Sequence, residues 1–350
     1  MKPGANTLRE IYHQPRAWDV CLQYLDTLDV HALAGDQIPE EVAWIFVGCG
    51  TSYYLAQAAA SSFTLLNARR AYAVPASEVT IFPPLVFPNK PSQIFPVLIS
   101  RSGHTSEILQ VAAWLNARGI DFLAITCDGN ELETTTPRVI KLPIVEESTV
   151  MTSSFTSMLL ALQYVAAWFA DEREFLTSLK KLPHLLEDLL EKYGPQVERF
   201  AQDRFDNFTF LGQGPFYAIA CESALKVMES STSYAQYFHT LEFRHGPKSI
   251  VSDRTLIGAL ISEAGYLDEV LVLEEMKALG GRTLAIANDA SSQLRSAADL
   301  LIELSLPVPE LARLVVYVVW GQLLGSYLGL AKGLDPDNPR NLSRIVTLPA

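Results

Sequence analysis

The sequence is poor in cysteine and holds no arrangement of residues that is typical of a metal site. Its four cysteines, Cys21, Cys49, Cys127 and Cys221, lie far apart, and none belongs to a Cys-x-x-Cys pair. This spacing supports neither a disulfide framework nor a zinc site. The six histidines show no ligand spacing with cysteines or carboxylates. We therefore expect no metal and no cofactor, and a reducing cytoplasm as the location.

Positive charge is also scarce, since 27 Lys and Arg face 39 Asp and Glu, for a net charge of −12. A nucleic acid or an anionic membrane would need a basic surface, so neither is expected as a partner. The first residues, Met1 to Asn6, lack the apolar segment of a signal peptide. One uncharged run, 314–331, approaches the length of a membrane span, but its glycines and its Gln322 and Ser326 favour a buried core helix.

Short apolar runs alternate with helical stretches along most of the chain. The predicted strands are 44–47, 70–74, 95–99, 122–126 and 139–142, then 208–211, 256–261, 284–286 and 300–302. Helical stretches at 53–66, 105–117 and 268–279, and one that begins at Ala218, lie between them. This pattern predicts an α/β protein with two tandem, doubly wound parallel sheets that carry helices on both faces. The second half repeats the first, because the strand before Gly212-Gln213-Gly214 matches the strand before Gly48-Cys49-Gly50.

Residues 171–200 differ from both halves, since charges are dense there and Pro183, Gly194 and Pro195 interrupt the pattern. We interpret them as a helical linker. The predicted division is an N-terminal helical segment at 1–30, a first domain at 31–170, the linker at 171–200, a second domain at 201–335 and a C-terminal tail at 336–350.

The segment Ser100-Arg101-Ser102-Gly103-His104-Thr105 follows a strand and opens a helix. Its hydroxyls can donate to phosphate oxygens, its glycine lets the backbone approach a ligand, and the helix end adds free N–H groups. Ordinary helix capping would explain one hydroxyl but not three. Gly48-Cys49-Gly50-Thr51-Ser52 occupies the equivalent turn of the first strand, so we expect both loops at one sheet edge, where such folds bind ligands. The GxGxxG motif is absent, which argues against a dinucleotide.

Three charged residues share one face of the helix that follows the second glycine turn. Glu222, Lys226 and Glu229 are spaced i, i+4 and i+7, within an arc of roughly 60°. A solvated Glu–Lys–Glu ladder is the simplest alternative, but the apolar residues between them favour burial. His245 precedes Gly-Pro in a loop, a place where catalytic side chains are common, although a lone histidine is more often structural.

Seven motifs occur in an order that is typical of a known family. They are Gly50-Thr51-Ser52, Ala76-Ser77-Glu78, the 100–105 segment, Leu211-Gly212-Gln213-Gly214, the 222–229 segment, His245-Gly246-Pro247 and Pro339-Arg340-Asn341-Leu342. Together they resemble the isomerase half of glucosamine-6-phosphate synthase, which is built from two SIS (sugar isomerase) domains. The resemblance covers nearly the whole chain, from Glu10-Ile11-Tyr12 to the last residues.

The resemblance implies a role for each matching residue. The phosphate-binding positions are Ser52, Ser100, Arg101, Ser102 and Thr105. The sugar-binding positions are Thr51, Val150, Thr152 and Arg344, and the tail closes the active site. Glu229 resembles the base that moves a proton between C1 and C2 of the sugar, with Lys226 near it. His245 resembles the ring-opening histidine, which the family supplies from the neighbouring subunit, so a homodimer with shared active sites is implied.

Two departures from the synthase favour breakdown of an amino sugar over its synthesis. The glutaminase domain has no counterpart here, so we expect no glutaminase activity. Arg344 stands where the synthase has a lysine that forms a Schiff base, and a guanidinium is a very poor nucleophile for that step. We therefore expect an isomerase that deaminates a glucosamine-6-phosphate-type sugar to the ketose phosphate and ammonia. The alternatives are a deglycase of fructosamine 6-phosphates, such as fructoselysine type, and a non-catalytic sugar-phosphate-binding regulator.

Overall fold

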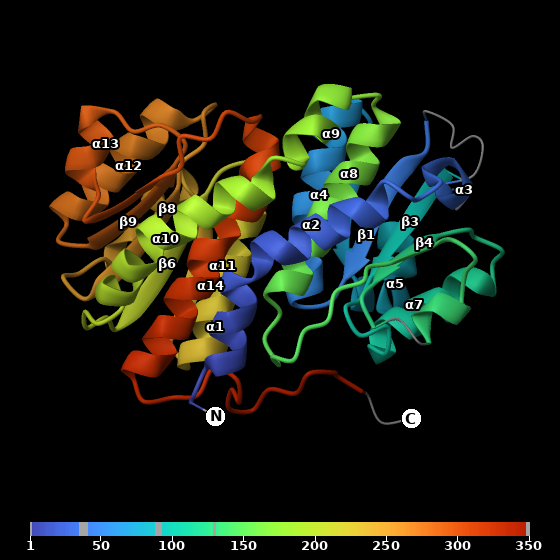
Figure 1. Ribbon diagram of the computed structural model, residues 1–350, viewed down its shortest axis with the longest axis horizontal. Coiled ribbons are helices and arrows are strands. Elements are labelled where there is room, and N and C mark those ends of the chain that lie inside the picture. The colour runs from blue at the N-terminus through green and yellow to red at the C-terminus, as the bar shows by residue number, and fades with distance from the viewer. Residues whose placement is uncertain (1, 35–40, 88–92, 129–130, 348–350) are drawn as a thin grey trace. The chain divides into compact units, whose positions relative to one another are not determined.

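The computed structural model describes residues 2–34, 41–87, 93–128 and 131–347. The chain forms two compact units, and each is built from three separate segments of the sequence (Figure 1). Unit 1 comprises Met1–Pro15, Glu147–Thr152 and Lys181–Leu342, and unit 2 comprises Arg16–Glu146, Ser153–Lys180 and Ser343–Ala350. The domain limits predicted from the sequence follow chain order, whereas these units follow contacts, so the limits stay a prediction.

Unit 2 is built on a five-stranded parallel sheet with the order β2-β1-β3-β4-β5. The strands are β1 (Ala43–Gly48), β2 (Ala71–Pro75), β3 (Ile94–Ile99), β4 (Leu123–Thr126) and β5 (Val139–Lys141). The helices are α2 (Gln14–Leu25), α3 (Val30–Ala34), α4 (Thr51–Asn67), α5 (Ala76–Ile81), α6 (Pro83–Val86), α7 (Ser106–Asn116), α8 (Ser153–Phe169) and α9 (Arg173–Leu179). Strands of this kind are buried on both faces, which explains their continuous apolar runs.

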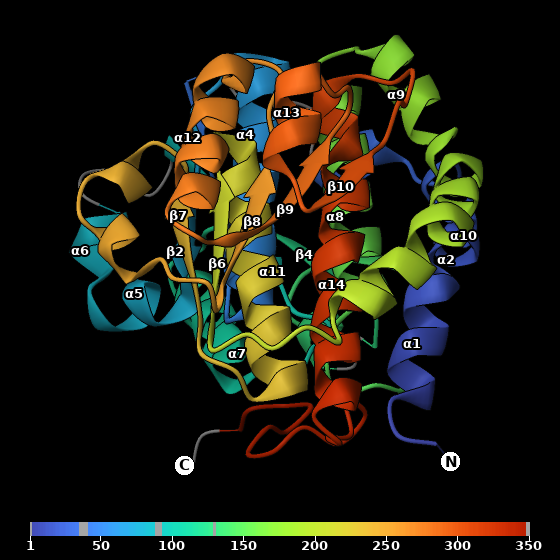
Figure 2. The same ribbon diagram turned by 90° about the vertical axis from the view of Figure 1, so that its left-hand side faces the viewer.

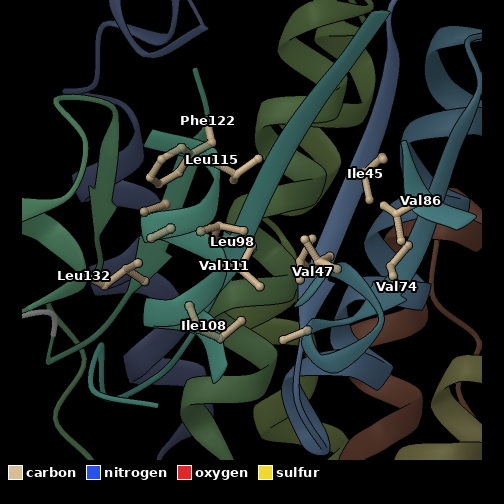
Figure 3. Close-up of a cluster of buried hydrophobic side chains, with 14 residues drawn as sticks. Ile45, Val47, Val74, Val86, Leu98, Ile108, Val111, Leu115, Phe122 and Leu132 are labelled. Carbon is tan, nitrogen blue, oxygen red and sulfur yellow. The ribbon is translucent and has the colours of Figure 1, made fainter. Parts of the chain in front are cut away.

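One face of this sheet packs its apolar side chains against α7. Figure 3 shows Val47 of β1 and Leu98 of β3 beside Ile108 and Val111 of α7, and all four are buried. On the other face, Trp44 packs against Phe63 of α4 with 4.4 Å between the ring centroids. Both faces are therefore covered by helices, as the sequence predicted.

Unit 1 repeats the same plan with a second parallel sheet, in the order β10-β9-β8-β6-β7. The strands are β6 (Asn207–Gly212), β7 (Ala235–His239), β8 (Thr255–Leu260), β9 (Arg282–Ala287) and β10 (Leu300–Glu303). The helices are α1 (Ala5–Tyr12), α10 (Leu182–Phe200), α11 (Pro215–Ser231), α12 (Tyr266–Ala278), α13 (Ser292–Ala297) and α14 (Leu314–Ala331). Read from β7, this order is that of the first sheet, so the predicted repeat extends to the whole sheet.

The repeat includes the turn after the first strand of each sheet. Gly50 and Gly214 precede α4 and α11 with nearly the same backbone angles, φ 53° and ψ −124° against φ 55° and ψ −128°. A Cβ on Gly48 would lie 2.2 Å from the Ser52 carbonyl oxygen, and a Cβ on Gly212 would lie 2.3 Å from that of Phe216. Both turns therefore need glycine for the same steric reason.

The long apolar helix α14 packs along α11 within unit 1 (Figure 2). By length and composition the stretch Glu310–Ala331 could cross a membrane, but 89% of its most apolar window is buried. Its glycines face α11: a Cβ on Gly321 would lie 2.4 Å from the Ser223 hydroxyl, and one on Gly325 would lie 2.6 Å from the Lys226 carbonyl oxygen. Small residues thus allow close contact of two core helices, which is the role that the sequence predicted for 314–331.

Candidate active site

The predicted phosphate loop lies in unit 2, between β3 and the N-terminus of α7. Ser100, Arg101 and Ser102 are buried, and the Ser100 Oγ lies 3.1 Å from the Thr105 Oγ1. The Gly103 N–H donates to the Ser100 Oγ over 3.2 Å, and Gly103 adopts a left-handed conformation with φ 69°. The loop thus gathers hydroxyls at a helix N-terminus, an arrangement that suits a phosphate group.

The second predicted loop leaves the same edge of the same sheet. Strands β1 and β3 are adjacent and pair Val47 with Leu98, so the 48–52 turn and the 100–105 loop begin at neighbouring strand ends. The chain goes to opposite sides of β1 after these two strands, which makes this position the topological switch point of the sheet. Thr51 and Ser52 open α4 there and are buried. The expectation that both loops meet one sheet edge is confirmed.

The Arg101 side chain has two firm contacts inside unit 2. Its Nη1 lies 2.9 Å from Oε2 of Glu146, and both side chains are almost completely buried. Its Nη2 donates to the carbonyl oxygen of Arg344 over 3.2 Å. Glu146 also accepts from Ser153 and from the Ser154 N–H at the start of α8. Arg101 therefore ties the loop to α8 and to the tail, while its predicted contact with phosphate stays a prediction.

The tail segment with Arg344 lies against the phosphate loop within unit 2. The Arg344 Nη2 is 3.2 Å from Oδ2 of Asp128, which follows β4. The Ser106 N–H, in the first turn of α7, donates to the carbonyl oxygen of Val346 over 3.4 Å. Arg344, which the sequence matched to the position of the synthase lysine, thus lies beside the loop with its guanidinium paired to a carboxylate.

The predicted acid–base cluster lies in unit 1, on α11. The Lys226 Nζ is 3.1 Å from Oε1 of Glu222 and 2.5 Å from Oε2 of Glu229. Lys226 is 1% exposed and Glu222 is fully buried, whereas the Glu229 side chain is 15% exposed. Burial lowers the pKa of Lys226, but the two carboxylates raise it more, so the net pKa lies above its ordinary value. The cluster is a buried ionic group and not a solvated ladder, and Glu229 is its most accessible member.

The other predicted residues of unit 1 lie in two loops. His245 follows the short helix Glu242–Arg244 after β7, its side chain is exposed, and its N–H donates to the Glu242 carbonyl oxygen. Val150 and Thr152 are buried in the irregular segment between β5 and α8. The structure thus groups Ser52, Ser100–Thr105 and Arg344 in unit 2, and Lys226 with Glu229 in unit 1. Among the described residues, no group of three or more His, Cys, Asp or Glu side chains is placed to hold a metal.

Two polar residues beside these positions were assigned no role from the sequence, although Glu10 lies at the start of the family resemblance. Glu146 binds Arg101 from 45 residues away, and Glu10 holds the segment with Val150 from 137 residues away. Neither belongs to a motif whose spacing reveals its partner. These partners come together only when the chain folds.

Comparison with known proteins agrees with this geometry. The sequence pattern of the SIS domain matches twice, at residues 41–167 and 206–319. The chain belongs to the SIS domain family. Each match contains one of the two sheets, so the repeat seen in the structure is a repeat of SIS domains. The predicted fold class, two tandem SIS domains with parallel sheets, is confirmed.

Relatives within the SIS family include both long and short proteins. The chain is 30% identical over 370 residues to the glutamine–fructose-6-phosphate aminotransferase (isomerizing) of Caldanaerobacter subterraneus, covering 97% of this chain and 58% of that protein. The chain therefore spans a little over half the length of the curated relatives it matches.

Solved structures give matches over full chains. A glucosamine-6-phosphate deaminase from Thermotoga maritima is 27% identical with a TM-score of 0.82, over 98% of this chain and 100% of that one. A tagatose-6-phosphate ketose/aldose isomerase from Escherichia coli is 24% identical with a TM-score of 0.86, over 96% and 98%, and supports the fold.

Proposed function

We propose that this SIS protein is a phosphosugar isomerase that deaminates an amino-sugar phosphate of the glucosamine-6-phosphate type. The observation that carries the proposal is the buried cluster of Glu222, Lys226 and Glu229. A protein that only senses a sugar phosphate needs a phosphate loop, but it does not need a buried lysine between two carboxylates. Burying such charges is costly unless they are paired, so a chain that keeps them is expected to use them.

The proposed chemistry assigns one role to each group of residues. The hydroxyls of Ser52, Ser100, Ser102 and Thr105 hold the phosphate, with Arg101 beside them. Thr51, Val150, Thr152 and Arg344 contact the sugar, and His245 from a partner subunit of a homodimer opens the ring.

Glu229 would then carry out the proton transfer of the isomerisation. It removes the proton from C2 of the open-chain amino sugar and returns it to C1, which converts the aldose into a 2-imino ketose. Water hydrolyses this imine, so the sugar phosphate and one water give the ketose phosphate and ammonia. The accessible edge of Glu229 fits a group that has to meet a substrate.

Deamination is favoured over synthesis by Arg344 and by one solved relative. The Arg344 guanidinium pairs with Asp128, and a guanidinium is a very poor nucleophile for forming a Schiff base. The relative from T. maritima that matches over its full length is itself named a glucosamine-6-phosphate deaminase. A deglycase of fructosamine 6-phosphates would move the proton in the opposite direction, from C1 to C2, and hydrolysis at C1 would then release the amino acid and an aldose phosphate. A cytoplasmic location follows from a phosphorylated substrate.

A turnover assay separates these possibilities. Purified protein would be given glucosamine 6-phosphate and, separately, a fructoselysine-type phosphate, and ammonia, free amino acid and ketose or aldose phosphate would be measured. We expect ammonia and ketose phosphate from the first substrate. Glu229→Gln should lower kcat by 10²-fold or more, as is typical for loss of a general base. Glu191→Gln, on the exposed face of α10, is the matched control. Release of the amino acid would favour the deglycase, and no turnover of either compound would contradict the proposal.

A further inference from the structure

A buried carboxylate on the first helix holds the segment that carries two of the proposed sugar contacts. Glu10 of α1 is 8% exposed. Its Oε1 accepts from the Glu147 N–H over 2.5 Å, and both of its oxygens lie 3.3 Å from the Ser148 nitrogen. The Ser148 hydroxyl also donates to Oε2. One side chain thus binds the start of the 147–152 segment at three donors, all within unit 1.

The far end of the same segment is held from α14. The Gln322 amide donates to the carbonyl oxygen of Thr152 over 3.1 Å, and its own oxygen accepts from Gln14 over 3.0 Å. These side chains are buried. The 147–152 segment has no regular secondary structure, so side chains replace the backbone ladder that would otherwise fix it.

Energetics explain why this contact fixes the segment. A hydrogen bond to a charged group is roughly twice as strong as one between neutral groups. A buried carboxylate needs several such donors to offset the loss of water. A shift of the segment would leave the buried Glu10 carboxyl without its donors, so the native position of Ser148 is strongly favoured. Val150 and Thr152 follow Ser148 within four residues, so their positions depend on that of Ser148.

We infer that Glu10 is a positioning residue that fixes the 147–152 segment for contact with the sugar. The inference rests on the proposed sugar contacts of Val150 and Thr152. Glu10 would not touch the substrate, and it acts only through the backbone and hydroxyl of Ser148 and the backbone of Glu147. Its loss should therefore impair recognition of the sugar while the phosphate loop, which belongs to unit 2, keeps its affinity for phosphate.

Three variants test this inference. Glu10→Gln keeps the size of the side chain but loses the charge and one acceptor. Gln322→Leu removes the contact at Thr152 independently. Arg9→Ala, on the same helix, removes only the exposed ion pair with Glu147 and is the matched control. For each protein, kcat and KM for glucosamine 6-phosphate are measured, together with competitive inhibition by inorganic phosphate and amide exchange at Glu147 and Ser148.

We expect Glu10→Gln to lower kcat/KM by roughly 10- to 100-fold, the effect of misplacing a substrate contact. Inhibition by phosphate should change less than about twofold, and exchange at Glu147 and Ser148 should become faster. Gln322→Leu should act in the same direction, and Arg9→Ala should stay close to wild type.

Unchanged kcat/KM in a folded Glu10→Gln protein would overturn the inference, because Glu10 would then only dock α1. An equal loss of phosphate affinity would also overturn it. Wild-type turnover is measured first and tests the proposed function separately. Amide exchange reports on the Glu10 contact whatever that first result is, so the two failures can be told apart.

Discussion

The two sheets have the same strand order, but the loops after their third strands are chemically different. In unit 2, the Ser100–Thr105 loop contains three hydroxyls and opens α7. In unit 1, the corresponding loop begins at Ser262, whose N–H and hydroxyl both donate over 2.7 Å to the buried carboxylate of Glu269. An internal carboxylate thus takes the donors that a bound anion would need. The same fold thus occurs twice, and the loop of unit 2, which has no such internal carboxylate bound to its hydroxyls in the contacts described above, is the one that we propose binds the phosphate.

The helices after the first strands also differ, but here unit 1 carries the polar groups. Positions 222, 226 and 229 of α11 carry the Glu–Lys–Glu cluster, whereas the matching positions of α4 are Ala58, Ser62 and Leu65. The first turns differ too, since Thr51 and Ser52 of unit 2 correspond to a proline and a phenylalanine in unit 1. The proposed phosphate-binding groups are therefore concentrated in one SIS domain and the proposed acid–base groups in the other.

The largest effect is expected from removing the hydroxyls of the Ser100–Thr105 loop in unit 2. Replacement of Ser100, Ser102 and Thr105 by alanine removes three hydroxyl donors, each expected to contribute about 1.5–3 kcal/mol against a charged phosphate. We expect kcat/KM to fall by about 1,000-fold or more, because the losses are only partly additive. Steady-state kinetics with the amino-sugar phosphate measure this change. Ser262→Ala in the other sheet is the control and should leave kcat/KM within about twofold. Equal losses in both proteins would contradict the comparison.

The second prediction concerns the stability of the charged cluster. Lys226→Met leaves Glu222 and Glu229 without their buried cation, and breaking one partner of a buried ion pair costs about 3–5 kcal/mol. Urea unfolding should show a loss of about 3 kcal/mol in the free energy of unfolding. Adding Glu222→Gln to this variant should recover about 1 kcal/mol, since it removes one unpaired charge. No recovery in this double-mutant cycle would mean that Glu222 and Lys226 are not coupled.

Much of the fold could be predicted because its signals are local. Buried parallel strands appear as continuous apolar runs, and the glycine turns and the hydroxyl loop are contiguous in the chain. Strand β7 was missed because Ala235–His239 lies at a sheet edge, is half-exposed and has no apolar run. Helix α8 was missed for a different reason: it is buried on nearly all sides, so its sequence shows no polar face that repeats with a helical period.

The candidate site was predictable only in part, for a related reason. The shared face of Lys226 and Glu229 follows from helix geometry, but its burial depends on packing against α14, nearly a hundred residues later. The partners of Arg101 and Glu10 come from remote segments, so spacing cannot reveal them. Side chains that position a site are found from contacts, whereas side chains that form it can be found from motifs.

A third prediction concerns the hydrogen bonds between Glu269 and the loop of unit 1 that begins at Ser262. Glu269→Ala leaves the Ser262 N–H and hydroxyl buried without their acceptor, which should cost about 2 kcal/mol in the free energy of unfolding. Activity should change little, because this loop is not proposed to bind the substrate. Chemical unfolding and steady-state kinetics of the same samples provide the two readouts. A loss of activity without a loss of stability would assign this loop a role in catalysis.

The smallest expected effect is the pH dependence of that same carboxyl. Burial raises the pKa of Glu269 above its ordinary value, although its hydrogen bonds to Ser262 oppose the shift. The folded state therefore binds the proton more tightly than the unfolded chain, so this contribution to stability is complete below the ordinary pKa of glutamate. It is lost as the pH rises through the raised value of the folded state. Relative to Glu269→Gln, which does not titrate, the wild type should lose stability as the pH rises through the raised pKa of Glu269. Parallel pH profiles of the two proteins in urea unfolding measure this difference. A loss of stability with rising pH in the wild type alone would show that burial disfavours the Glu269 anion more than its hydrogen bonds to Ser262 stabilise it, whereas equal profiles would contradict a raised pKa.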